Sequence, residues 1–106
     1  MSGAMLFEVM TPLDFVVRCS TEYWIFISTR KHPTLAGRER DIVRVLATPD
    51  EIRRSRKDHN VLLFYQGAAP RWLCAVARRE DGSGFLITAY PTDSIKSGET
   101  VWTRSK

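Results

Sequence analysis

His32 is the residue best suited to proton transfer in this sequence. It lies between Lys31 and Pro33, and histidine titrates close enough to neutral pH to act as a general acid or base. A lone histidine in a loop is more often a surface or capping residue, so that ordinary role stands beside the catalytic one. The second histidine, His59, falls in a polar turn and is interpreted as a surface residue.

Positive charge is concentrated in one segment of the chain. Residues 30–57 contain nine cationic and four acidic side chains, a surplus of five, whereas the net charge of the whole sequence is +4. Arginine side chains there could hold the phosphates of a nucleic acid, because they donate paired hydrogen bonds to phosphate oxygens. The position of this surplus predicts a polyanionic partner such as RNA.

Helical spacing predicts two helices that position this segment. The first is capped by Ser20 or Thr21 and ends near His32, because Pro33 disfavours helical geometry in the residue before it. The second is predicted over residues 37–47, with an apolar stripe on one side and charged residues on the others.

After Pro49 the apolar period changes to two, which is typical of strands. Four strands are predicted, at Ile52–Arg56, Val61–Gln66, Arg71–Arg79 and Phe85–Pro91. The turns between them are short, so consecutive strands should be antiparallel neighbours in a meander. The predicted fold class is α+β, with N-terminal helices, preceded by a short hairpin at residues 6–18, on one face of a four-stranded antiparallel sheet. Residues 95–102 either add an edge strand or cover the sheet.

Alternation along these strands sorts the side chains into two faces. The purely apolar sets, such as Leu62 with Phe64 and Trp72 with Cys74 and Val76, are predicted to face the helices. The open face then carries Tyr65, Arg71, Thr88 and Tyr90, with either Arg53 and Ser55 or Arg54 and Arg56. Each has an ordinary role in a solvated strand, but together they suit an RNA strand, since arginines bind phosphate and tyrosines stack on bases.

Length and composition predict a single globular domain over residues 1–106. No apolar run is long enough to cross a bilayer and none resembles a signal peptide, so no membrane partner is expected. Cys19 and Cys74 form no zinc-binding pattern and are predicted to be buried and reduced, which favours a cytoplasmic protein. Residues 1–4 are either part of the domain or a leader before an alternative start at Met5.

Two stretches carry a family resemblance, "RKHPTLAGRERDIVRVLATPDEIRRSRKDHNVLLFY" and "WLCAVARREDGSGFLITAYPTDSIKSGETVW". Their features are a His-Pro between two helices, a P-D-E-I-x-x-S entry to the sheet, an aromatic strand end at Phe64-Tyr65 and a terminal I-T-A-Y strand. In this order they resemble small prokaryotic domains of the barnase–EndoU–colicin–RelE superfamily, in particular its phage- and toxin-associated nucleases. The resemblance covers residues 23–102.

The resemblance implies helices on a four-stranded antiparallel sheet and a metal-independent endoribonuclease that needs no cofactor. In such enzymes the substrate 2′-hydroxyl attacks the adjacent phosphate, while the protein supplies proton transfer and charge stabilisation. Carried onto this chain, His32 is the general acid or base, Arg38 and Arg53 hold the phosphate, and Tyr90 is a stacking platform or second acid. Ser55, Tyr65 and Thr88 would contact the substrate or the transition state. The cations Lys31, Arg54 and Arg71 would also bind the substrate. A glutamate base like that of barnase has no counterpart here.

Two other functions fit the same residues. One is a non-catalytic RNA- or protein-binding module, and the other is an interaction domain whose basic patch meets an acidic partner. A toxin would be neutralised by an acidic antitoxin or immunity protein, so RNA and such a protein are the expected partners. RNA binding that survives His32→Ala while cleavage is abolished would single out the ribonuclease.

Overall fold

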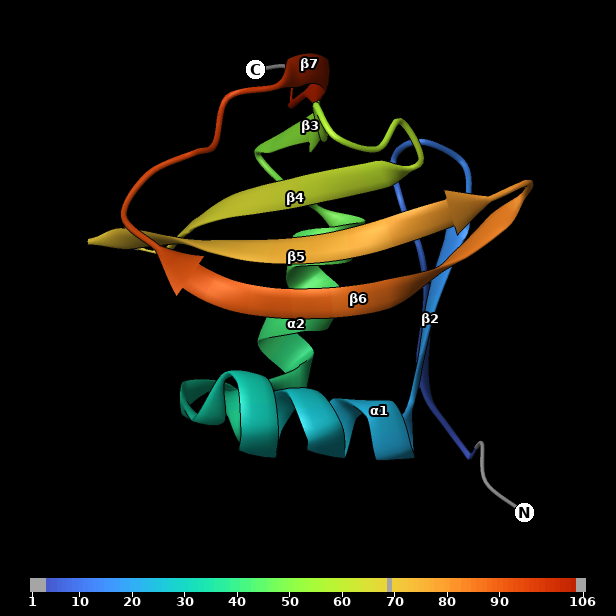
Figure 1. The fold of residues 1–106 in the computed structure, drawn as a ribbon, viewed down its shortest axis with the longest axis vertical. Coiled ribbons are helices and arrows are strands. Elements are labelled where there is room, and N and C mark those ends of the chain that lie inside the picture. The colour runs from blue at the N-terminus through green and yellow to red at the C-terminus, as the bar shows by residue number, and fades with distance from the viewer. Residues whose placement is uncertain (1–3, 69, 105–106) are drawn as a thin grey trace.

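A computed structural model describes residues 4–68 and 70–104, and these form one mixed seven-stranded sheet with two short α-helices (Figure 1). The strands lie in the order β1-β2-β6-β5-β4-β3-β7. Their bounds are β1 Met5–Met10, β2 Val16–Ser20, β3 Glu51–Arg54, β4 Val61–Ala68, β5 Arg71–Glu80, β6 Ser83–Thr92 and β7 Glu99–Thr103. Residues 1–4, for which the sequence leaves open a leader or a part of the domain, lie, apart from Ala4, outside the described residues.

The predicted fold class, helices on a four-stranded antiparallel meander, is wrong. Strands β3 to β6 are consecutive antiparallel neighbours, but the sheet continues beyond them on both sides. The N-terminal hairpin β1–β2 joins it through a parallel pairing of Val16–Arg18 with Ser83–Phe85. Short turns reveal antiparallel neighbours in a sequence, whereas a parallel pair between distant segments leaves no local pattern.

The helical segments follow β2 and cover one edge and one face of the sheet. They are α1 Thr21–Phe26, a π-helical turn η1 Ile27–Lys31, a 3-10 turn η2 Pro33–Leu35 and α2 Glu39–Ala47. The Ser20 hydroxyl caps α1 by accepting a hydrogen bond from the Tyr23 amide at 3.1 Å. Where β2 diverges from β6, the Tyr23 hydroxyl donates to the Ile87 carbonyl at 2.6 Å. The segment of α1 and η1 therefore lies along the β6 edge that β2 leaves unpaired (Figure 1).

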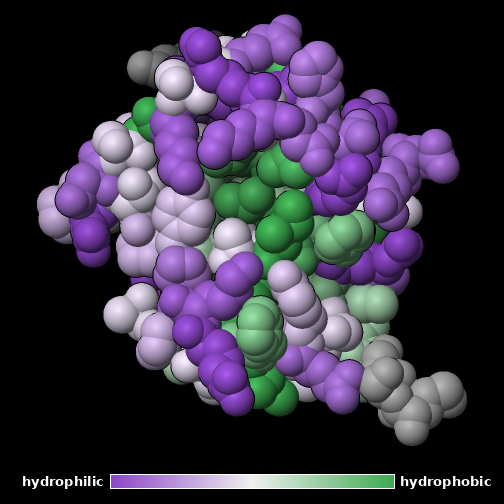
Figure 2. All heavy atoms as spheres, viewed as in Figure 1, coloured by the Kyte–Doolittle hydropathy of each residue, from purple (hydrophilic) through white to green (hydrophobic). Residues whose placement is uncertain are grey.

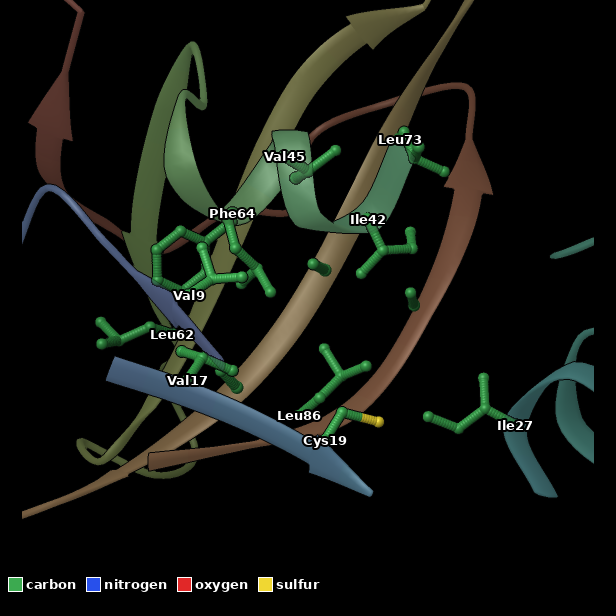
Figure 3. Packing of buried hydrophobic residues seen from close by; sticks show 14 of the residues in the cluster. Val9, Val17, Cys19, Ile27, Ile42, Val45, Leu62, Phe64, Leu73 and Leu86 are labelled. Carbon is green, nitrogen blue, oxygen red and sulfur yellow. The ribbon is translucent and has the colours of Figure 1, made fainter. Parts of the chain in front are cut away.

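The main core lies between α2 and the sheet. Ile42 and Val45 of α2 belong to the same buried cluster as Phe64 of β4 and Leu73 of β5 (Figure 3). The prediction that Leu62 and Phe64 face the helices is confirmed, but the predicted faces of β5 are reversed. Leu73, Ala75 and Ala77 point to the helices, and Cys74 and Val76 point away. Because β5 is central and apolar on both faces, its composition does not distinguish them.

A second, smaller apolar cluster lies on the face that α2 does not cover. Its buried members are Leu63, Tyr65, Cys74 and Val76, and Ile95 packs against them. Figure 2 shows this apolar patch at the bottom of a hollow surrounded by hydrophilic side chains. Residues 93–98, which we call the strap, run from β6 to β7 past this face (Figure 1). The C-terminal tail thus does both things predicted for it, since Ile95 covers the sheet and β7 adds an edge strand.

The cysteines agree with the prediction, because Cys19 and Cys74 are both buried and unpaired. Among the helices of the described residues, none is long and apolar enough to cross a membrane.

Candidate functional site

A hollow of about 520 Å³ opens on the face away from α2. We call it the open-face pocket. Its walls come from the turn after β3 and from the strap, and its floor from β4, β5 and β6. The lining residues are Ser55, Arg56, Lys57, Val61, Leu63, Val76, Thr88, Tyr90, Lys96 and Ser97. An apolar floor with cationic and hydroxyl-bearing walls suits a ligand that carries both an aromatic base and a phosphate.

The three cations of the pocket stand out because no acidic partner lies against them in the part of the chain that the structure describes. Within residues 4–68 and 70–104, the side chains of Arg56, Lys57 and Lys96 form no ion pair, and all three are exposed. Their charge is therefore available to an anion, and the low-dielectric floor beneath them strengthens its effect.

His32 and Lys96 both lie beside the ring of Tyr90. The rings of His32 and Tyr90 have centroids 5.7 Å apart, and the Lys96 ammonium lies 5.4 Å from the centre of the Tyr90 ring. His32 is half-buried, and two hydrogen bonds fix its backbone. The His32 amide donates to the Ile27 carbonyl at 2.8 Å, and the His32 carbonyl accepts from the Leu35 amide at 2.9 Å. The end of η1 thus holds a histidine beside the sheet residue that lines the pocket.

Two hydroxyls at this site are buried without a hydrogen-bond partner among the described residues, Thr88 Oγ1 and Tyr90 Oη. Burial raises the pKa of Tyr90, and the neighbouring Cys74 thiol raises it further, so the phenol stays protonated. Sulfur is at best a weak hydrogen-bond partner for it. Leaving a buried hydroxyl without a partner is costly, and a role in binding or catalysis is one explanation for such groups.

The strap is held by two of the residues that the sequence predicts to contact substrate. The Lys96 amide donates to the Tyr65 hydroxyl at 3.1 Å, and Arg53 Nη1 donates to the Lys96 carbonyl at 3.3 Å. Arg53 in turn pairs with Glu51 at 2.6 Å, and the Thr100 hydroxyl donates to the same carboxylate oxygen at 3.1 Å. Tyr65 is fully buried, which raises its pKa to about 12. Tyr65 and Arg53 therefore position Lys96.

The structure gathers some of the predicted site residues and separates others. Ser55, Thr88 and Tyr90 line the pocket, and His32 contacts it through Tyr90. The remaining predicted cations lie against other groups. Their partners are Asp41 for Arg38 at 2.8 Å, Asp93 for Arg71 at 2.8 Å, Glu99 for Arg54 at 3.2 Å and the Phe26 ring for Lys31 at 5.9 Å.

Lys57, Lys96 and Ser97 line the pocket but are not among the site residues that the sequence predicts. Lys57 follows the predicted Ser55 by two positions in the same turn, so the charge surplus of that segment is the signal that could have found it. Lys96 and Ser97 lie in a segment whose sequence gives only an apolar residue followed by a cation, and their role depends on the path of the strap. No cluster of potential metal ligands occurs in the part of the chain that the structure describes.

No protein-family model, curated protein or solved structure matches this chain.

Proposed function

We propose that the protein is a metal-independent endoribonuclease that cleaves RNA at the open-face pocket. The observation that carries the proposal is Tyr90, which has His32 beside its ring and Lys96 over it, in a pocket lined by cations that form no ion pair within the described residues. An imidazole and an ammonium, both capable of proton transfer, thus lie beside a tyrosine that lines this cationic pocket. We place this activity in the cytoplasm, where two free thiols stay reduced.

The chemistry needs only groups that this chain supplies. His32 takes the proton of a 2′-hydroxyl, and the 2′-oxygen attacks the adjacent phosphorus. The bond from phosphorus to the 5′-oxygen breaks, and the Lys96 ammonium gives that oxygen a proton. The products are a 2′,3′-cyclic phosphate and a 5′-hydroxyl end, and solvent restores the two protein groups. Arg56 and Lys57 stabilise the negative charge that grows on the phosphate oxygens.

The second candidate is RNA binding without cleavage. It is favoured by the position of His32, which contacts Tyr90 but is not among the residues that line the pocket. Either activity would be blocked by an acidic antitoxin or immunity protein that covers Arg56, Lys57 and Lys96, and we propose this as the protein partner.

The deciding experiment incubates the purified protein with total RNA in EDTA. Fragments ending in cyclic phosphate are expected, and His32→Ala should reduce their rate of formation by roughly 10²–10⁴-fold, the usual share of a general acid or base. Thr34→Ala is the matched control, because Thr34 is exposed in the adjacent turn η2. RNA that is bound but left intact would favour the second candidate, and cleavage that disappears in EDTA would contradict the proposal.

A further inference from the structure

A second hollow adjoins the open-face pocket. It has a volume of about 480 Å³ and is lined by Arg54, Ser55, Arg56, His59, Gly98 and Glu99. Ser55 and Arg56 line both hollows, so these two residues form the wall between them. Because they share this wall, the two hollows adjoin, and we call the pair the trough.

The same two chain segments border the whole trough. The turn after β3 contributes residues to both hollows, and on the other side Ser97 lines the first hollow while Gly98 lines the second. Gly98 lies so close to β3 that a Cβ atom there would come within 2.6 Å of the Arg54 carbonyl oxygen. The chain passes from the strap into β7 at this close approach, so the border of the trough continues along β7.

The second hollow carries positive charge, and one of its cations, Arg54, already has hydrogen-bond partners. Arg54 donates from Nε to Glu99 at 3.2 Å and from Nη1 to the His59 carbonyl at 2.9 Å. The Arg54 and Glu99 side chains are 37% and 70% exposed, and ion pairs this exposed contribute little stability. A phosphate can therefore compete with Glu99 for Arg54, and Arg56 already reaches this hollow without an acidic partner among the described residues.

We propose that the second hollow is a subsite for the neighbouring nucleotide of the bound RNA strand, with Arg54 and Arg56 on its phosphate. The inference rests on the proposed function, because it extends the same substrate beyond the reacting nucleotide. A trough bordered by cations along its length fits a linear polyanion better than a compact ligand. The protein should therefore prefer strands long enough to occupy both hollows.

The test compares a dinucleotide with a hexanucleotide as substrates. Arg54→Ala should raise KM for the hexanucleotide about tenfold, the effect of removing one charge-assisted hydrogen bond, with kcat unchanged. The dinucleotide, which fills only the open-face pocket, should be unaffected. Arg40→Ala is the matched control, because it removes an exposed arginine of α2 that lines neither hollow.

Glu99→Gln supplies a result of opposite sign, which damage to the fold would not produce. Removing the negative charge that borders this hollow should lower KM for the hexanucleotide by several-fold. Equal changes for both substrates, or an unchanged KM in both variants, would overturn the subsite. If the protein cleaves neither substrate, the proposed function fails. The subsite is then tested by the affinity of the same variants for a 2′-O-methyl hexanucleotide, where Arg54→Ala should weaken binding about tenfold.

Discussion

At the scale of single residues, two tyrosines of the open face have opposite hydrogen-bonding situations. Tyr65 and Tyr90 both pair with Cys74 across neighbouring strands, so the three form one row across the sheet. The Tyr65 hydroxyl accepts a bond from the strap, whereas the Tyr90 hydroxyl has no partner among the described residues. The same chemical change at the two positions should therefore have different consequences.

Tyr65→Phe should lower the free energy of unfolding by about 1 kcal/mol, because the Lys96 amide loses its acceptor. Tyr90→Phe removes a buried hydroxyl for which the described residues offer no partner, and it should leave the free energy of unfolding unchanged or higher. Urea unfolding of the two variants measures the difference. A loss of stability in Tyr90→Phe as large as in Tyr65→Phe would show that the Tyr90 hydroxyl has a partner, such as an ordered water.

The two thiols predict a fall in stability at alkaline pH. Burial raises the pKa of both Cys19 and Cys74 from 9.0 to about 11. Between these values the unfolded thiols lose their protons while the folded ones keep them. The contribution of the two buried, protonated thiols to the free energy of unfolding is therefore complete below pH 9, and it declines as the pH rises to 11. Chemical unfolding of Cys19→Ala with Cys74→Ala should show a shallower decline in this range than the wild type, and an equal slope would contradict the prediction.

At the scale of elements, the turn after β3 carries the charge that an RNA strand would meet. Replacing Arg56 and Lys57 with Ala should weaken RNA binding and reduce the salt dependence of log affinity by about 0.7 for each phosphate that the protein no longer neutralises. The control is Arg38→Ala with Arg71→Ala, whose guanidinium groups lie against Asp41 and Asp93. Binding titrations at several salt concentrations measure both slopes. An equal reduction of the salt dependence in the two double variants would contradict the prediction, because it would mean that cations with an ion pair and cations without one among the described residues contribute equally to RNA binding.

The strands of the meander could be predicted because their apolar period and short turns are local properties. Thr88 and Tyr90 could be placed on one face for the same reason, since alternation in the C-terminal half of β6 follows the sequence, whereas for Ser55 the sequence left two alternatives open. The roles of Arg38, Arg53 and Arg71 could not be predicted, because each depends on which carboxylate lies within reach. Lys96 could not be found because its position depends on Tyr65 and Arg53, which are distant from it in the sequence.

At the scale of the whole molecule, the N-terminal hairpin is attached to the meander at Gly84. This residue lies opposite Val17 of β2, and a Cβ atom there would collide with the Arg78 carbonyl oxygen and come within 3.0 Å of the Phe15 ring. Backbone and a buried ring surround the site, so no flexible side chain can move to make space.

Gly84→Ala should therefore lower the free energy of unfolding by about 1–3 kcal/mol, the usual cost of overpacking. Gly82→Ala is the matched control, because a Cβ atom there meets nothing within 4 Å. Thermal and urea unfolding of both variants test the prediction. Equal stability of the two variants would show that the junction between β2 and β6 accommodates an added methyl group without losing stability.

The parallel pairing of β2 with β6 also determines when this chain can finish folding during its synthesis. Strand β2 leaves the ribosome early and must wait for residues 83–85, so the isolated β1–β2 hairpin has no sheet to join and is at best marginally stable. Thr88, Tyr90 and Lys96 are synthesised later still. A nascent chain that stops short of the strap would therefore carry His32 and the basic turn but no assembled pocket, and an RNA-cleaving activity would be absent until the strap has left the ribosome.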